Sequence, residues 1–187
     1  LTLLVGIPLV GHIPIIAGGT LVFIATVLLI IQLAQMQRAK RPLTTPATQS
    51  TPTTKFYIAG LAYFLVGILI GTGLWTGWLS TLGVLGNAKE VHIHANSWGL
   101  MSLVFAGLLI EMYPAWAKRP FANKKAITPI FWLMTLGAFG LIFGPWFANT
   151  TLLVPGLLLH LTATVWLLIT AIKPLWGNRQ AWTPGIT

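Results

Sequence analysis

Long apolar runs alternate with short polar stretches along the whole chain. The first run, about residues 4–35, has an uncertain start between Leu4 and Pro14, and the others cover about residues 56–78, 91–114, 127–147 and 152–175. A helix needs about 20 apolar residues to cross the hydrocarbon core of a membrane. The pattern therefore predicts an all-α fold, an integral membrane bundle of about five transmembrane helices in a single domain over residues 1–187.

The polar connections differ in charge from one side of this bundle to the other. The segments after the first and third runs and the C-terminal tail hold ten of the eleven Lys and Arg residues, namely Arg38, Lys40, Arg41, Lys55, Lys118, Arg119, Lys124, Lys125, Lys173 and Arg179. The connections on the opposite side hold only Lys89. By the positive-inside rule, this predicts an N-terminus outside and a C-terminus in the cytoplasm. Residues 41–55, RPLTTPATQSTPTTK, have no apolar periodicity and are expected to form a flexible cytoplasmic linker.

Composition narrows the environment and the chemistry. Hydrophobic residues make up 56% of the chain and charged residues 7%, against roughly 25% charged residues in soluble domains. The lipid bilayer is thus the expected partner, and we expect the bacterial inner (plasma) membrane. The net charge of +9 does not indicate nucleic acid, because the basic residues lie between membrane-spanning runs. The absence of cysteine excludes disulfides and thiolate-ligated metals from this chain.

The four histidines are the candidate functional residues. Ionisable side chains inside a membrane are costly and are usually functional, and neutral imidazole is the commonest metal ligand. His12, His92, His94 and His160 all fall in or beside the predicted outer half of the bundle. We therefore expect them to ligate a metal or a haem iron, although His12 lies near the interface. Hydrogen bonding within the bundle is the alternative role.

The spacing of His92 and His94 places them on different faces of one helix. Residues two apart on a helix are rotated by about 200°, so the two rings should serve two different neighbours. The His92 face continues through Asn96, Gly99, Leu103 and Gly107, and its glycines leave space for another helix or a flat ligand. The His94 face continues through the bulky Trp98, Met101 and Phe105.

His160 could lie beside His94, because both belong to helices that descend from the outer face. Gly156 precedes His160 by one turn and follows Pro155. The glycine either clears room for a haem edge or, with the proline, merely kinks the helix. Glu111, near the cytoplasmic end of its helix, is expected to be exposed, with proton entry as the alternative role. The pairs Gly67 and Gly71, Gly73 and Gly77, and Gly140 and Gly144 are predicted to be helix-packing sites.

Residues 91–114, VHIHANSWGLMSLVFAGLLIEMYP, resemble the tenth helix of the catalytic subunit of the haem-copper oxidase superfamily. The resemblance is to the C-type oxidase and nitric oxide reductase branches, where His-x-His is followed a few residues later by Gly. It implies that His92 would hold a high-spin haem and His94 a low-spin haem. The complete catalytic centre of that family needs more histidines than the four in this chain. Oxygen or nitric oxide reduction by this chain alone is therefore not expected.

The sequence thus favours a b-type haem-binding membrane protein related to oxidase subunit I. It would act in electron transfer or as a subunit of a respiratory or photosynthetic complex, alongside other membrane subunits or as a homo-oligomer. His94 and His160 are the predicted axial pair, and copper is the alternative metal. Two other functions stay open: a scaffold subunit without a redox centre, and a protein for copper or haem handling or nitric oxide response.

Overall fold

The computed structural model describes residues 12–39, 53–117, 121 and 123–173, and every regular element in these ranges is a helix. The long helices are α2 (His12–Ala39), α3 (Thr54–Thr76), α6 (Ile127–Trp146) and α7 (Thr150–Ile172). A further rod, called the central rod below, is built from α4 (Ala88–His94), the π-helix η2 (Ala95–Met101) and α5 (Ser102–Ala117). Short 3₁₀ helices η1 (Trp78–Leu82) and η3 (Lys124–Ala126) complete the described elements.

Within the described residues, five helices are long and apolar enough to cross a membrane, so the chain is an integral membrane protein with an all-helical bundle. The observed bounds of the last four agree with the predicted runs to within a few residues. The predicted linker at 41–55 falls mostly outside the described residues. Its last two residues are helical, however, because α3 begins at Thr54.

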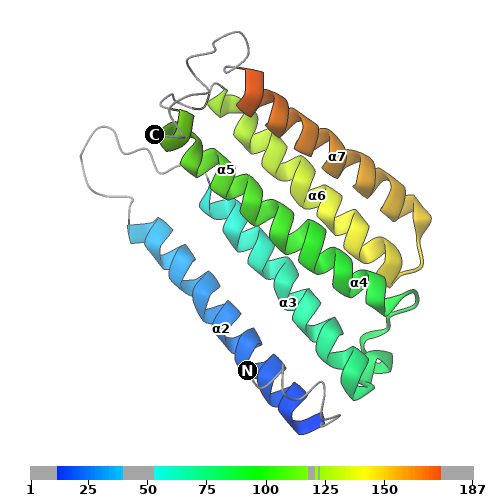
Figure 1. Ribbon diagram of the computed structural model, residues 1–187. Helices are drawn as coiled ribbons and strands as arrows, with labels where there is room; N and C mark the ends of the chain where they lie inside the picture. Colours follow the sequence, from blue (N-terminus) through cyan, green and yellow to red (C-terminus); the bar gives the residue numbers. More distant parts are fainter. Residues whose placement is uncertain (1–11, 40–52, 118–120, 122, 174–187) are drawn as a thin grey trace.

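Each spanning helix runs antiparallel to the one before it, and the five rods lie side by side in chain order (Figure 1). The helix α6 is the most enclosed of them. In its most apolar window 56% of the residues are buried inside the protein, against 22–33% in the other four spans. The outward faces of the remaining helices are rich in exposed Leu, Ile, Val, Phe and Trp, as expected for surfaces that contact lipid.

Small residues hold α6 and α7 at short range. A Cβ atom added to Gly140 would lie 2.7 Å from the Cα atom of Gly156, and one added to Gly144 would lie 2.8 Å from the Cβ atom of Leu153. The predicted packing role of the Gly140 and Gly144 pair is thus confirmed. On the other side of the bundle, Gly67 and Gly71 of α3 face the rod that begins with α4, which confirms that pair too.

The pair Gly73 and Gly77 does not form a helix-packing site. Gly73 faces Leu79 of η1, whereas an added Cβ on Gly77 would meet nothing within 4 Å. Gly77 ends α3 with a φ of 82°, a left-handed conformation that favours glycine at helix C-termini. The turn from α3 into η1 therefore explains why position 77 is a glycine.

The connection from η1 to α4 packs over the C-terminal end of α6. The backbone N–H of Leu85 donates to the carbonyl of Trp146 at 2.8 Å, and Gly86 lies directly against the carbonyl of Pro145. Asn87 then caps α4 by accepting from the N–H of Glu90. This arrangement fixes the start of α4, the helix that carries His92 and His94.

Candidate functional site

His92 and His94 point to two different helices, as their spacing predicts. Nδ1 of His92 lies 2.8 Å from the carbonyl oxygen of Gly67 on α3. Nδ1 of His94 lies 2.7 Å from the carbonyl oxygen of Leu141 on α6. A carbonyl only accepts hydrogen bonds, so each Nδ1 carries the proton, and in the neutral ring Nε2 keeps the lone pair. This is the state in which a histidine can ligate a metal.

The face that continues from His92 packs on α3. An added Cβ on Gly67 would meet Asn96, and one on Gly71 would meet the His92 ring. Further along the rod, Gly99 fits beneath Tyr63. The space that these small residues leave is thus filled by a neighbouring helix, which is one of the two occupants that the sequence allowed.

The seven-residue π-helix from Ala95 to Met101 follows the histidines immediately. Sequence periodicity did not predict it. The side-chain amide of Asn96 donates to the carbonyl of His92 at 2.7 Å, and such local side-chain bonds compete with the regular helical ladder. Asn96 is therefore the sequence signal associated with this segment, and π-helices recur at functional sites.

His160 is 0% exposed and is enclosed where α7 meets α6 and the central rod. Its Nδ1 lies 3.0 Å from the carbonyl oxygen of Met134 on α6, and its Nε2 lies 2.9 Å from Oγ of Ser102 on α5. The Trp98 ring meets the imidazole edge-on at 5.2 Å between centroids. His160 therefore links α7 to both α6 and the central rod. Ser102, its partner, was not identified from the sequence.

The structure does not bring His94 and His160 together. Their α6 carbonyl partners, Leu141 and Met134, are seven residues apart, which is about 10 Å along a helix. His160 thus lies deeper in the bundle than His94. The room expected beside Gly156 is filled by the backbone of Gly140, so this glycine serves the contact between α6 and α7.

The two remaining sequence candidates lie at opposite ends of the bundle. His12 begins α2 with an exposed side chain. Glu111 is exposed as predicted, and its carboxylate accepts a hydrogen bond of 2.8 Å from the Tyr57 hydroxyl. That bond ties α3 to α5. In the part of the chain that the structure describes, no three His, Asp or Glu side chains come close enough to hold a metal ion.

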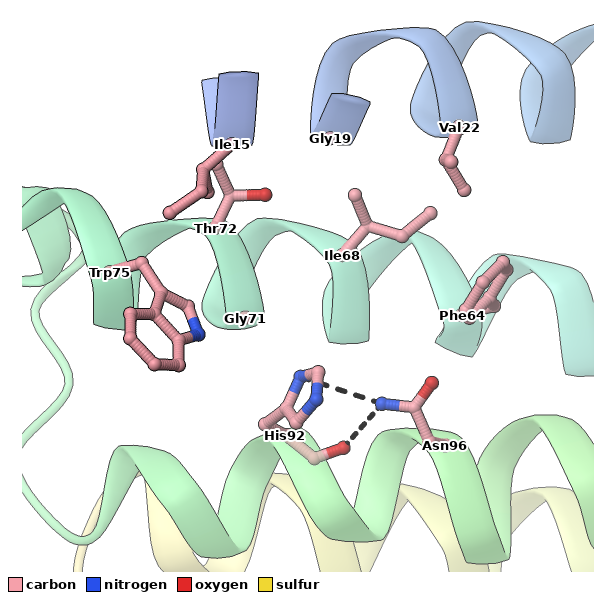
Figure 2. Close-up of a pocket in the computed structure, with 10 residues that line it drawn as sticks. All are labelled: Ile15, Gly19, Val22, Phe64, Ile68, Gly71, Thr72, Trp75, His92 and Asn96. Atoms are coloured by element: carbon pink, nitrogen blue, oxygen red, sulfur yellow. Dashed lines mark hydrogen bonds between the residues drawn. The ribbon is translucent and has the colours of Figure 1, made fainter. Parts of the chain in front are cut away.

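A cavity of about 250 Å³ lies between α2, α3 and the start of the central rod. Figure 2 shows its lining, which includes Val22, Ile68, Thr72, Trp75, His92 and Asn96. The cavity is mostly apolar, and the His92 ring lies beneath Gly71 at its floor. This cavity could not be predicted from the sequence, because its lining comes from three helices that are separate in the chain.

No match to the chain is found among family models, curated proteins or solved structures. The resemblance to the haem-copper oxidases therefore depends on the His-x-His helix alone.

The three described imidazoles inside the bundle differ in how well they fit a haem iron. His94 keeps a ring nitrogen available, because it is half-buried, its Nδ1 is fixed by Leu141, and its Nε2 has no partner in the described ranges. His160 does not fit as it stands, since both its nitrogens are hydrogen-bonded and its side chain is enclosed. His92 borders a cavity of about 250 Å³, which is smaller than the roughly 300–1,000 Å³ of sites for drug-sized ligands and too small for a porphyrin.

Proposed function

We propose that the protein is a b-type haem-binding membrane protein, with His94 as an axial ligand of the iron. The observation that carries the proposal is the 2.7 Å hydrogen bond between Nδ1 of His94 and the carbonyl oxygen of Leu141. Histidines that ligate metals commonly donate their other ring N–H to a backbone carbonyl in this way, which fixes the ring and the tautomer. The resemblance of residues 91–114 to the oxidase helix supports the same assignment.

A bound haem would supply one-electron transfer, with a potential set by its axial ligands and its burial. The chain's own contribution is to hold the His94 ring in place through α6 and to exclude water with apolar helices. Because His160 is engaged within the bundle, a second axial ligand would come from a partner chain. We therefore infer a subunit of a larger respiratory or photosynthetic complex, or a homo-oligomer, in a bacterial inner membrane.

A scaffold subunit without a redox centre is the second candidate. It is favoured by the way in which all three buried or half-buried imidazoles bond to backbone carbonyls of neighbouring helices. Such bonds between helices stabilise membrane bundles by about 0.6 kcal/mol each on average. Under this function, His92, His94 and His160 would all be structural cross-links.

The two candidates give different absorption spectra. We expect the protein, purified from its native membrane, to show the sharp reduced α-band of a b-type cytochrome. A pyridine haemochrome assay should give about one haem for each pair of chains that supplies the two axial ligands. The substitution His94→Ala should reduce that band to background, because the iron loses a ligand. The matched control is His12→Ala, which removes an exposed imidazole at the end of α2 and should leave the band unchanged.

Absence of haem from the protein in its native complex would contradict the proposal and favour the scaffold function. A band that survives His94→Ala would show that His94 is not an axial ligand. If His12→Ala loses as much haem as His94→Ala, the loss is not specific to His94, and it does not support His94 as the ligand. Circular dichroism of each variant would establish that its helices remain folded.

The orientation of the bundle can be tested with single introduced cysteines, because the chain has no native cysteine that would have to be removed first. Loop charge predicts that the turn before α7 lies outside and that η3 lies in the cytoplasm. A membrane-impermeant maleimide should therefore label Thr150→Cys in intact spheroplasts, and Lys125→Cys only after lysis. The reverse pattern would invert the topology. Both positions are exposed.

A further inference from the structure

The cavity between α2, α3 and the central rod has a polar floor and apolar walls. Its walls come from Ile15 and Val22 of α2 and from Phe64 and Ile68 of α3. Its floor carries the His92 ring and the Asn96 amide, which lie side by side below α3 in Figure 2. No charged side chain is among the described residues that line it.

The hydrogen bonds around the floor determine which atoms are free to meet a ligand. Nδ1 of His92 donates to the Gly67 carbonyl, so Nε2 is left as an acceptor, and it lies on the Trp75 side of the ring (Figure 2). The Asn96 amide nitrogen donates to the His92 carbonyl at 2.7 Å and lies 3.5 Å from Nδ1 of His92, as the dashed lines in Figure 2 show. Its amide oxygen is a second acceptor at the floor. A ligand that satisfies these two acceptors brings a hydrogen-bond donor.

The volume sets the size of that ligand. A dry apolar cavity of about 150 Å³ is enough to bind benzene, and this one holds about 250 Å³. A single substituted ring therefore fits, whereas a porphyrin does not. The lack of lining charge excludes an ionic ligand, because burying an unpaired charge in such surroundings is costly.

We propose that this cavity binds a neutral, lipid-soluble aromatic ring that bears a hydroxyl group, with the hydroxyl donating to Nε2 of His92. A phenol satisfies each condition: its ring fills the apolar space between α2 and α3, and its O–H supplies the missing donor. The same chemistry occurs in a free phenol and in the ring-shaped headgroup of a membrane lipid. The proposal does not require a haem, since it uses His92 and not His94.

Fluorine NMR of the full chain in lipid nanodiscs can test this with a matched pair of probes. 4-Fluorophenol and 4-fluoroanisole have nearly the same shape, but only the phenol can donate a hydrogen bond. One net hydrogen bond corresponds to about two- to ten-fold in affinity. We expect 4-fluorophenol to bind more tightly by that factor, and His92→Phe to remove the difference between the two probes.

Val22→Phe fills the cavity from α2 without altering its polar floor, and it should weaken binding of both probes at least ten-fold. Val165→Phe makes the same change on an exposed position of α7 and should have no effect. Val22→Phe, compared with this control, keeps the test informative if His92→Phe does not fold. Equal binding of the two probes, or binding unchanged by Val22→Phe, would overturn the proposal and indicate a cavity that holds water or lipid chains.

Organic extraction of the purified protein, followed by mass spectrometry, distinguishes the two sources of the ligand. A phenolic lipid that co-purifies with the native chain, but not with Val22→Phe, identifies a membrane source. Probe binding without such a lipid identifies a free phenol. Both results support the site, and neither depends on the outcome of the haem spectrum.

Discussion

Gly156→Leu should separate α6 from α7 and destabilise the protein more than any other single substitution considered. A Cβ atom at position 156 would lie 2.7 Å from the Cα atom of Gly140 and 2.9 Å from the carbonyl oxygen of Gly137. Both are backbone atoms, so no rotation of a side chain can relieve the contact. Overpacking of a core typically costs 1–3 kcal/mol even where side chains can adjust. We expect the free energy of unfolding to fall by at least about 3 kcal/mol.

Reversible unfolding in mixed detergent micelles, followed by circular dichroism and tryptophan fluorescence, measures this loss. Gly156→Ala adds only the Cβ atom and should give a smaller decrease. Leu158→Phe is the matched control, because it adds volume on the same helix at a side chain that is 60% exposed. If Gly156→Leu unfolds at the same denaturant fraction as Leu158→Phe, the close contact between α6 and α7 does not exist as described.

The spanning helices could be predicted because the hydrocarbon core of a membrane permits few backbone conformations. Every backbone polar group must be satisfied within the bilayer, so an apolar run of about 20 residues has to be a helix. The glycine pair at positions 140 and 144 was predictable for a related reason, since close helix contacts in membranes require small residues. The same rule failed for Gly77, because glycine also ends helices, and sequence spacing does not separate the two uses.

The histidine arrangement was only half predictable. The 200° rotation between His92 and His94 follows from helical geometry, and the structure places them against two different helices as expected. That these helices are α3 and α6 could not be predicted. The depth of His160 could not be read from its position in α7, because depth depends on how far α7 slides along α6. The contact of Gly140 with Gly156 sets that register. The axial roles predicted for the histidines remain predictions.

Features that arise from three helices meeting were outside the reach of a linear pattern. The bond between His160 and Ser102 joins residues 58 positions apart, and nothing in the sequence marks Ser102 as the partner of this histidine. The cavity beside His92 exists because α2, α3 and the central rod do not close completely around Gly71 and Thr72. Local periodicity describes one helix at a time, so it cannot predict a cavity that three helices leave between them.

His160→Ala should destabilise the protein whether or not haem is bound. The imidazole fills a fully enclosed position and makes hydrogen bonds to Met134 on α6 and Ser102 on α5. Truncating a large buried side chain to alanine typically costs 2–5 kcal/mol through the cavity that remains. Because membrane hydrogen bonds add about 0.6 kcal/mol each, we expect a loss of about 3 kcal/mol. The unfolding assay in detergent, on haem-free protein, measures it.

Two control variants separate this structural role from ligation. Ser102→Ala removes one partner of the imidazole and should cost about 1 kcal/mol, whereas His12→Ala removes an exposed imidazole and should leave stability unchanged. If His160 were an axial ligand and not a structural residue, its substitution would abolish the haem band and leave the stability of the haem-free protein unchanged. If His160→Ala abolishes the haem band while the haem-free protein unfolds as the unsubstituted chain does, His160 binds the iron and its two hydrogen bonds do not hold the bundle together. A loss of stability with the haem band retained would leave His94 as the ligand and assign His160 to the packing of α7.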